Sequence, residues 1–172
     1  MKITLYMAIS VDGYIAKKDG DSDWVSEVDN DNFMQQVTEK GCIIVGRRTF
    51  DQYQGELYPV KGIVNIVLTK NKIENYSADN VFYAQSPHEA VEIAQRQGCK
   101  EVLLVGGGTT NGLFLKENLI NEIILSVHPL ILGDGIKLFE GVEKFLSLSF
   151  IGQKKLGEDL IHLYYKIGSK VV

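Results

Sequence analysis

Three consecutive glycines at 106–108 interrupt the run EVLLVGGGTTNGLFL at residues 101–115. The apolar residues that end at Val105 have the pattern of a strand buried on both faces, and the residues after the glycines have the pattern of a helix. Glycine lets another group approach the backbone, and a helix that begins here, capped by Thr109 or Thr110, presents free N–H groups and a positive dipole end. The turn therefore predicts an anion site for phosphate, with a tight turn that binds nothing as the alternative.

A second glycine turn follows the apolar run 42–45 and reads Gly46-Arg47-Arg48-Thr49. Parallel strands that each end in a glycine turn and a helix N-terminus direct their backbone donors into one crevice, so the two turns together predict a diphosphate site. The arginines add positive charge there, unless they form a solvated surface pair. Neither turn carries the full dinucleotide fingerprint or a Walker sequence, so a standard Rossmann domain is not expected.

Thr69 and Lys70 follow another buried-strand pattern, at residues 63–68. A hydroxyl and an ammonium group at a strand end suit an extra phosphate, such as the one on the ribose of NADP. Polar loop residues have the same appearance, so both interpretations stay open.

Asp29 and Asp31 begin a helical pattern that runs to Lys40, where Gly41 ends it. Acidic residues in a first turn are favoured by the helix dipole, and this is the default interpretation. A carboxylate that projects from this turn into an apolar pocket would instead have a raised pKa and act as a proton donor or relay.

Trp24 is the only tryptophan and follows the polar loop at 19–23. A large apolar ring beside a polar loop suits the wall of a pocket for a flat ligand, which we favour. The alternative is a core anchor for the helix that follows.

Strand and helix patterns alternate along most of the chain. Strand patterns occupy residues 3–9, 42–45, 63–68, 81–84, 102–105 and 122–127, and helical patterns lie at 29–40, 87–97 and after 108. Two last strand patterns, at 146–155 and 160–167, predict an antiparallel hairpin. The expected fold is a single domain over residues 1–172, a three-layer α/β protein whose mostly parallel sheet has antiparallel strands at its C-terminal end.

Composition excludes several classes of protein. The 172 residues are 45% hydrophobic and 23% charged with a net charge of -4, which disfavours disorder and general attraction to nucleic acid. The most apolar run, at 123–132, is too short to span a bilayer, and no secretion signal follows Met1, so we expect a cytoplasmic protein. Cys42 and Cys99 lack metal-binding spacing, which predicts two free thiols and no metal site.

Four segments, in this order and spacing, resemble the dihydrofolate reductase superfamily, and in particular the branch that includes the C-terminal reductase domain of bacterial riboflavin-biosynthesis proteins. The resemblance spans nearly the whole chain. The segments are Ser10-Val11-Asp12-Gly13-Tyr14-Ile15-Ala16, Val45-Gly46-Arg47-Arg48-Thr49, Val105-Gly106-Gly107-Gly108 and Pro129-Leu130-Ile131-Leu132-Gly133-Asp134-Gly135.

The resemblance implies an NADPH-dependent reductase that transfers a hydride to a small planar nitrogen heterocycle. The implied activity is most like that of 5-amino-6-(5-phosphoribosylamino)uracil reductase or of a dihydrofolate reductase-like enzyme in riboflavin or pterin metabolism. The implied cofactor-binding residues are Ala8 and Ile15 at the nicotinamide, Gly46, Arg47, Thr49, Val105, Gly106, Gly107, Gly108 and Thr109 at the phosphates, and Thr69 and Lys70 at the 2′-phosphate. The implied catalytic residues are Asp29 or Asp31, Trp24 beside the nicotinamide, and Ser126, which matches a threonine of the family.

Two departures from the family pattern argue against folate as the substrate. Ungapped counting places Asn30 where dihydrofolate reductases carry a helix carboxylate, and only a shifted alignment gives Asp29 or Asp31. Ile63 stands where they carry an arginine for the glutamate of folate. No ribose-phosphate site is evident either. The alternative is therefore a non-catalytic nucleotide-binding or regulatory module on the same fold, which hydride transfer would distinguish from an enzyme.

The expected partners are a small heterocyclic substrate and a second copy of the chain. The apolar C-terminal strands could form an interface, and the resemblance implies a dimer because relatives of this branch are commonly dimeric, so we expect a homodimer. Neither nucleic acid nor a membrane is expected to bind.

Overall fold

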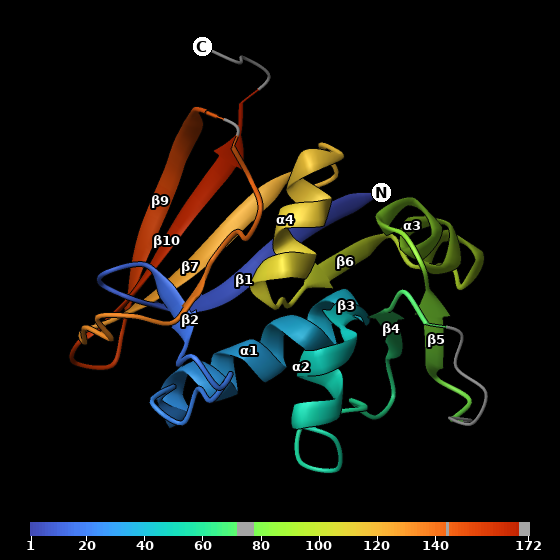
Figure 1. Cartoon of the computed structure of the whole chain (residues 1–172), viewed down its shortest axis with the longest axis horizontal. Helices are drawn as coiled ribbons and strands as arrows, with labels where there is room; N and C mark the ends of the chain where they lie inside the picture. The colour runs from blue at the N-terminus through green and yellow to red at the C-terminus, as the bar shows by residue number, and fades with distance from the viewer. Residues whose placement is uncertain (72–77, 144, 169–172) are drawn as a thin grey trace.

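The structure of the protein, a computed structural model, describes residues 1–71, 78–143 and 145–168 (Figure 1). Its main sheet has eight strands in the order β5-β4-β3-β6-β1-β7-β10-β9. These strands are β1 (Lys2–Ser10), β3 (Cys42–Gly46), β4 (Val64–Leu68), β5 (Val81–Ala84), β6 (Glu101–Leu104), β7 (Glu122–His128), β9 (Leu148–Leu156) and β10 (Leu160–Ile167). Figure 1 shows β5 at one edge and β9 at the other.

The main sheet is parallel from β5 to β7 and antiparallel from β7 to β9. This arrangement confirms the expected mostly parallel sheet with antiparallel C-terminal strands. A short second sheet pairs β2 (Tyr14–Ala16) with β8 (Ile136–Lys137). Because parallel strands run in the same direction, the loops that follow β1, β3, β4 and β6 lie at the same end of the strands.

Helices cover both faces of the main sheet, which gives the three layers. They are α1 (Glu27–Lys40), α2 (Arg47–Gln52), α3 (Pro87–Arg96) and α4 (Gly108–Lys116). Successive side chains of a strand point to opposite faces. Leu5 and Ile44 therefore pack with α3 and α4, whereas Tyr6 and Ile43 pack with α1 and α2.

Helix α1 begins two residues before the predicted start at Asp29. Ser26 is its N-cap, and the Ser26 hydroxyl accepts a hydrogen bond from the backbone N–H of Asp29 at 3.3 Å. The helix ends as predicted at Gly41, whose φ of 69° lies in the left-handed region that glycine adopts without a steric penalty. These two caps fix which residues of the first turn face the sheet.

The C-terminal hairpin is also confirmed, with β10 at the predicted residues and β9 beginning two residues late. Cys42 is buried and Cys99 half-buried, both as free thiols, as expected. Within the three described ranges, no helix is long and apolar enough to span a membrane.

Candidate active site

The two glycine turns meet at the C-terminal ends of strands β3 and β6. Strands β3 and β6 are neighbours and parallel, so both turns leave the sheet at the same end. The backbone N–H of Gly46 donates to the carbonyl oxygen of Gly106 at 2.7 Å. This hydrogen bond confirms that the two turns converge, as the strand patterns predict.

The three glycines of the second turn have different roles. Gly106 has a φ of +87°, which a side chain would disfavour, and a Cβ on Gly108 would overlap the carbonyl oxygen of Lys137. A Cβ on Gly107 would have one neighbour within 4 Å, the hydroxyl of Thr49 at 3.2 Å. Gly107 also lines the large cleft described below. Of the three, Gly107 is the glycine that leaves room for a ligand against the backbone.

Helix α4 begins at Gly108 without the threonine cap predicted for it. Its N-cap is Gly107, and no side chain caps it. The Thr109 hydroxyl donates instead to the Glu140 carboxylate at 2.5 Å, and Thr110 is buried against Gly46. The prediction of Thr109 or Thr110 as a cap was therefore wrong: the helix begins at Gly108, so both threonines lie inside its first turn.

The two arginines of the first turn point in different directions. The Arg47 Nε donates to both carboxylate oxygens of Asp51, at 2.6 and 2.5 Å, as an i,i+4 pair on α2. Arg48 lines the cleft. The structure thus favours Arg48, which the resemblance did not single out, as the arginine closest to a ligand.

Thr69 and Lys70 lie where β4 ends, at the same edge of the sheet. The Thr69 hydroxyl is buried and accepts from the backbone N–H of Asn71 at 3.3 Å, and Lys70 is exposed. Within the described chain, neither belongs to the lining of the cleft. Their assignment to an extra phosphate stays a prediction.

A cleft of about 610 Å³ opens between the glycine turns and α1. Among the predicted residues, its lining includes Ala8, Ile15, Asp29, Thr49, Val105 and Gly107. Phe33 and Met34 of α1, with Leu57 and Tyr58 after α2, add an apolar wall. A cleft of this size with an apolar wall and few polar groups is typical of a site for a small molecule.

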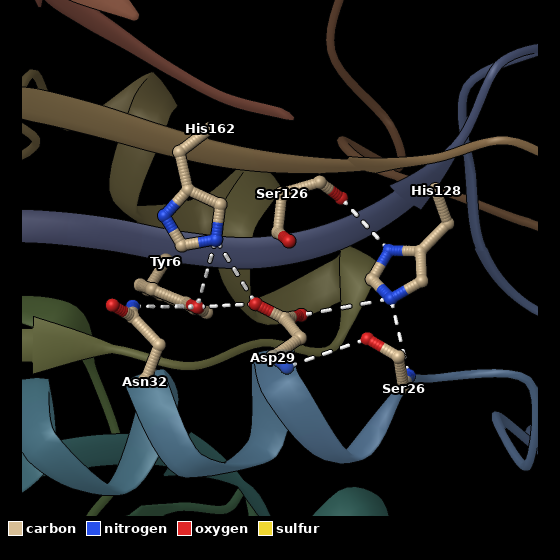
Figure 2. Close-up of polar contacts among 7 residues, drawn as sticks. All are labelled: Tyr6, Ser26, Asp29, Asn32, Ser126, His128 and His162. Atoms are coloured by element: carbon tan, nitrogen blue, oxygen red, sulfur yellow. Dashed lines mark hydrogen bonds and ion pairs between the residues drawn. The ribbon is translucent and has the colours of Figure 1, made fainter. Parts of the chain in front are cut away.

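A buried carboxylate, Asp29, lies at the α1 side of this cleft and is 1% exposed (Figure 2). Its Oδ1 accepts a hydrogen bond from the Tyr6 hydroxyl at 2.5 Å and lies 3.1 Å from His162 Nε2. Asn32 donates to the Tyr6 hydroxyl at 3.2 Å. Asp31, by contrast, is exposed and outside the cleft lining given by the described residues. Of the two carboxylates, only Asp29 is placed to meet a ligand.

The pKa of Asp29 lies below its ordinary value, whereas the alternative interpretation of this carboxylate required a raised pKa. Burial alone would raise the pKa, but hydrogen bonds from His162 and Tyr6 favour the charged form and hold the pKa below its ordinary value. Burial and the negative charge of Asp29 raise the pKa of Tyr6, so its hydroxyl keeps its proton. Asp29 is therefore an ionised acceptor, and the alternative interpretation, a carboxylate with a raised pKa, was wrong.

His128 and Ser126, both on β7, lie on the other side of Asp29 (Figure 2). The His128 Nε2 accepts from the backbone N–H of Ser26 at 3.2 Å, and Nδ1 faces the Ser126 carbonyl oxygen at 3.2 Å. These two contacts assign the ring proton to Nδ1. The Ser126 hydroxyl is buried beside the carboxylate without a hydrogen bond of regular geometry.

Trp24 packs on the edge of the His128 ring, with 5.1 Å between ring centroids. It is outside the cleft lining that the described residues form, and its indole N–H is buried without a partner. The interpretation of Trp24 as a pocket wall was therefore wrong. The ring packs instead on His128, whose Nε2 accepts from the backbone N–H of Ser26, the N-cap of α1.

Sequence reasoning missed Tyr6, Asn32, His128 and His162. These four residues surround Asp29 and come from β1, α1, β7 and β10. Tyr6 and His162, which contact each other, are 156 residues apart in the chain. Only the alternation along β1 gave a signal, because it directs Tyr6 to the same face of the sheet as α1.

A family model described as the RibD C-terminal domain matches residues 1–162 of the chain. The Bacillus subtilis protein YwjB is 30% identical over 95% of this chain and 97% of its own length. A crystal structure from Shewanella sp. PV-4 has a TM-score of 0.80 and 27% identity, and the match covers 98% of this chain and 99% of that one.

A bifunctional protein of Thermotoga maritima has the same fold. It is described as a diaminohydroxyphosphoribosylaminopyrimidine deaminase/5-amino-6-(5-phosphoribosylamino)uracil reductase, with a TM-score of 0.75 and 17% identity. The match covers 97% of this chain but 56% of that one, so this chain corresponds to just over half of the Thermotoga protein.

Proposed function

The chain belongs to the RibD C-terminal domain family, and we propose that it is an NADPH-dependent reductase of a small planar nitrogen heterocycle. The observation that carries the proposal is the convergence of the two glycine turns at one end of a cleft whose other end holds an ionised, buried carboxylate. One end suits a diphosphate, and the other suits the N–H groups of a heterocycle.

The glycine end fits the cofactor. The space at Gly107, which a side chain would fill, admits a phosphate against the backbone, beside the Thr49 hydroxyl and Arg48. Ala8 and Ile15 also line the cleft and offer apolar contacts for the nicotinamide. When bound there, NADPH supplies the hydride, while the protein supplies orientation and a site shielded from water.

At the carboxylate end, Asp29 orients the substrate. Both contacts from Tyr6 and His162 reach Oδ1, and Oδ2 lies 3.9 Å from His128 Nε2, too far for a hydrogen bond, so Oδ2 is the oxygen that would accept an N–H of the substrate. An ionised acceptor selects a heterocycle that presents a donor to it, because a substrate without one would leave the buried charge poorly solvated.

Oxidation of NADPH, followed at 340 nm with a panel of aminopyrimidines, pterins and dihydrofolate, tests the proposal. We expect turnover with at least one member of the panel. We also expect NADPH to bind tightly when no substrate is present. NADPH binding with no hydride transfer to any member would favour a non-catalytic nucleotide-binding module. That alternative has one supporting observation, because Asp29 is almost fully enclosed by its internal partners.

We also propose a homodimer that forms through β9. This edge strand exposes seven of its nine residues, and Phe150 and Ile151 are 59% and 56% exposed. An uncovered apolar edge strand is a liability unless a partner covers it. Light scattering should give a dimer for the wild-type chain and a monomer for Phe150→Glu. Val11→Glu, at an apolar side chain that is 63% exposed and distant from β9 in sequence, should stay a dimer.

A further inference from the structure

The charged side chains that line the cleft are mostly acidic. Among the described residues of the lining, four are carboxylates and one is a cation: Asp21, Asp23, Asp29, Glu56 and Arg48. Phosphate groups form their strongest hydrogen bonds with cations such as arginine. For two phosphorylated molecules, the described part of this lining offers one cation.

The single cation belongs to the cofactor end. Arg48 directly precedes Thr49, whose hydroxyl faces Gly107, so its position in the chain ties it to the converging glycine turns. Arg47 is already paired with Asp51 on the same helix. If the turns hold the cofactor diphosphate, Arg48 is the charge that neutralises it.

Lys17, which follows the lining residue Ala16, is neutralised by two carboxylates at once. Lys17 lies 2.9 Å from Asp21 and 2.7 Å from Asp23, both of which belong to the loop that lines the cleft. These three side chains together carry a net charge of -1. The loop therefore repels an anion.

The other end of the cleft is apolar and acidic. Phe33 and Met34 of α1 contribute apolar surface there, and the ionised Asp29 contributes negative charge. Elsewhere in the lining, Leu57 adds apolar surface and Glu56 adds a further carboxylate. A phosphate dianion placed at the Asp29 end would lose its hydration and face like charges without a counterion, which is strongly unfavourable.

We propose that the substrate is a planar nitrogen heterocycle without a phosphate group, neutral or cationic. The inference deepens the proposed function and rests on it, since it assigns the one cleft cation to the cofactor. It also separates this chain from the Thermotoga maritima protein, whose described reductase substrate carries a phosphoribosyl group.

Binding to the protein saturated with NADP⁺ tests the inference by titration calorimetry. The probes are matched pairs: 5-amino-6-(ribosylamino)uracil with its 5′-phosphate, and two further aminopyrimidine or pterin ribosides, each with and without a 5′-phosphate. We expect at least one unphosphorylated member to bind, and each phosphorylated partner to bind at least tenfold more weakly. Equal or tighter binding of any phosphorylated member overturns the inference, and so does failure of every unphosphorylated member to bind.

Two charge variants sharpen the test. Glu56→Lys should narrow the difference within each pair, whereas Glu92→Lys, the same charge change on α3 at the opposite face of the sheet, should leave it unchanged. If both variants alter the difference equally, net charge and not the cleft is responsible, and the inference fails.

The outcome is distinguishable from failure of the proposed function. Selective binding of unphosphorylated heterocycles with no hydride transfer upholds the inference about ligand class and removes the reductase. Turnover of a phosphorylated substrate as efficient as that of its unphosphorylated partner upholds the reductase and removes the inference.

Discussion

The two ends of the cleft are built in different ways. At the glycine end, backbone groups of two short segments meet through the Gly46 N–H and the Gly106 carbonyl oxygen. At the carboxylate end, side chains from one helix and three strands surround Asp29 (Figure 2). The shape of the first end is set mainly by the main chain, whereas the second end depends on the rotamers and protonation of several buried side chains.

This difference predicts how each end responds to mutation. A side chain added at Gly107 removes space without removing contacts, so binding should fail while folding survives. A side chain altered at the carboxylate end leaves buried donors without an acceptor, so stability and function should fall together.

The largest expected effect is that of Gly107→Val on NADPH binding. The added side chain fills the space beside Thr49 where the phosphate would lie, so we expect the affinity to fall by at least about 100-fold, or about 2.7 kcal/mol. Gly107 has a φ of -71°, which any residue adopts, so the melting temperature should change little. Fluorescence titration with NADPH measures the first quantity and thermal unfolding the second.

Gly152→Ala is the matched control, because a Cβ there has nothing within 4 Å. It should leave the affinity for NADPH unchanged. Unchanged affinity in Gly107→Val would instead remove this glycine, and with it the glycine end, from the site.

The second effect is a loss of stability in Asp29→Asn. The amide has one carbonyl oxygen for the donors that Asp29 accepts from Tyr6 and His162, and its NH₂ group brings donors where acceptors are needed. We expect the free energy of unfolding to fall by about 2 kcal/mol, together with a fall in kcat. Urea titration and steady-state rates measure the two changes.

Asp31→Asn serves as the control, because Asp31 lies two positions along the same helix and is exposed. Its free energy of unfolding should stay within about 0.5 kcal/mol of the wild type. Equal effects of the two substitutions would show that both carboxylates act only as charges at the start of α1.

The contrast also explains what the sequence could predict. The strands, α1 and the glycine turns depend on neighbouring residues, such as the apolar run before Gly46 and the stop at Gly41, so their patterns are legible. The parallel order then brings the turns together at one edge of the sheet.

The carboxylate end could not be predicted, because its residues are far apart in the chain. Tyr6 and His162 are 156 residues apart in the chain, and no local pattern announces that they share Asp29. The pKa of that carboxyl followed from these missed donors, which is why reasoning from burial alone gave the wrong direction. Trp24 was misassigned for a similar reason, since its partner His128 is on β7.

The third effect separates the cations of the glycine end. Arg48→Ala should weaken NADPH and NADH alike, by about tenfold, because Arg48 lines the cleft where both cofactors carry a diphosphate. The double variant Arg47→Ala/Lys70→Ala should weaken NADPH far more than NADH, because only NADPH has the extra phosphate predicted at Lys70. Dissociation constants of both cofactors for both variants show which cations contact the diphosphate and which contact the 2′-phosphate. Equal losses of NADPH and NADH in the double variant would place the 2′-phosphate elsewhere.

The smallest expected effect is a pH dependence at the carboxylate end. Because the pKa of Asp29 is lower in the folded chain than the usual value of about 3.9, its contribution to stability is complete above about pH 5 and is lost as the pH falls through the folded pKa. Asp29→Asn lacks this contribution at every pH. The difference in free energy of unfolding between wild type and Asp29→Asn should therefore be constant from pH 7 to 5 and shrink below pH 4.

Taking the difference isolates Asp29 from the other acids. Hydrogen bonds to neighbouring groups also lower the pKa values of Asp12, Asp21 and Asp134, but these residues are the same in both proteins and cancel. Urea titrations at several pH values between 3 and 7 give the curve. If the difference instead grows as the pH falls, the folded pKa of Asp29 is raised, and the carboxylate end is a proton donor and not an ionised acceptor.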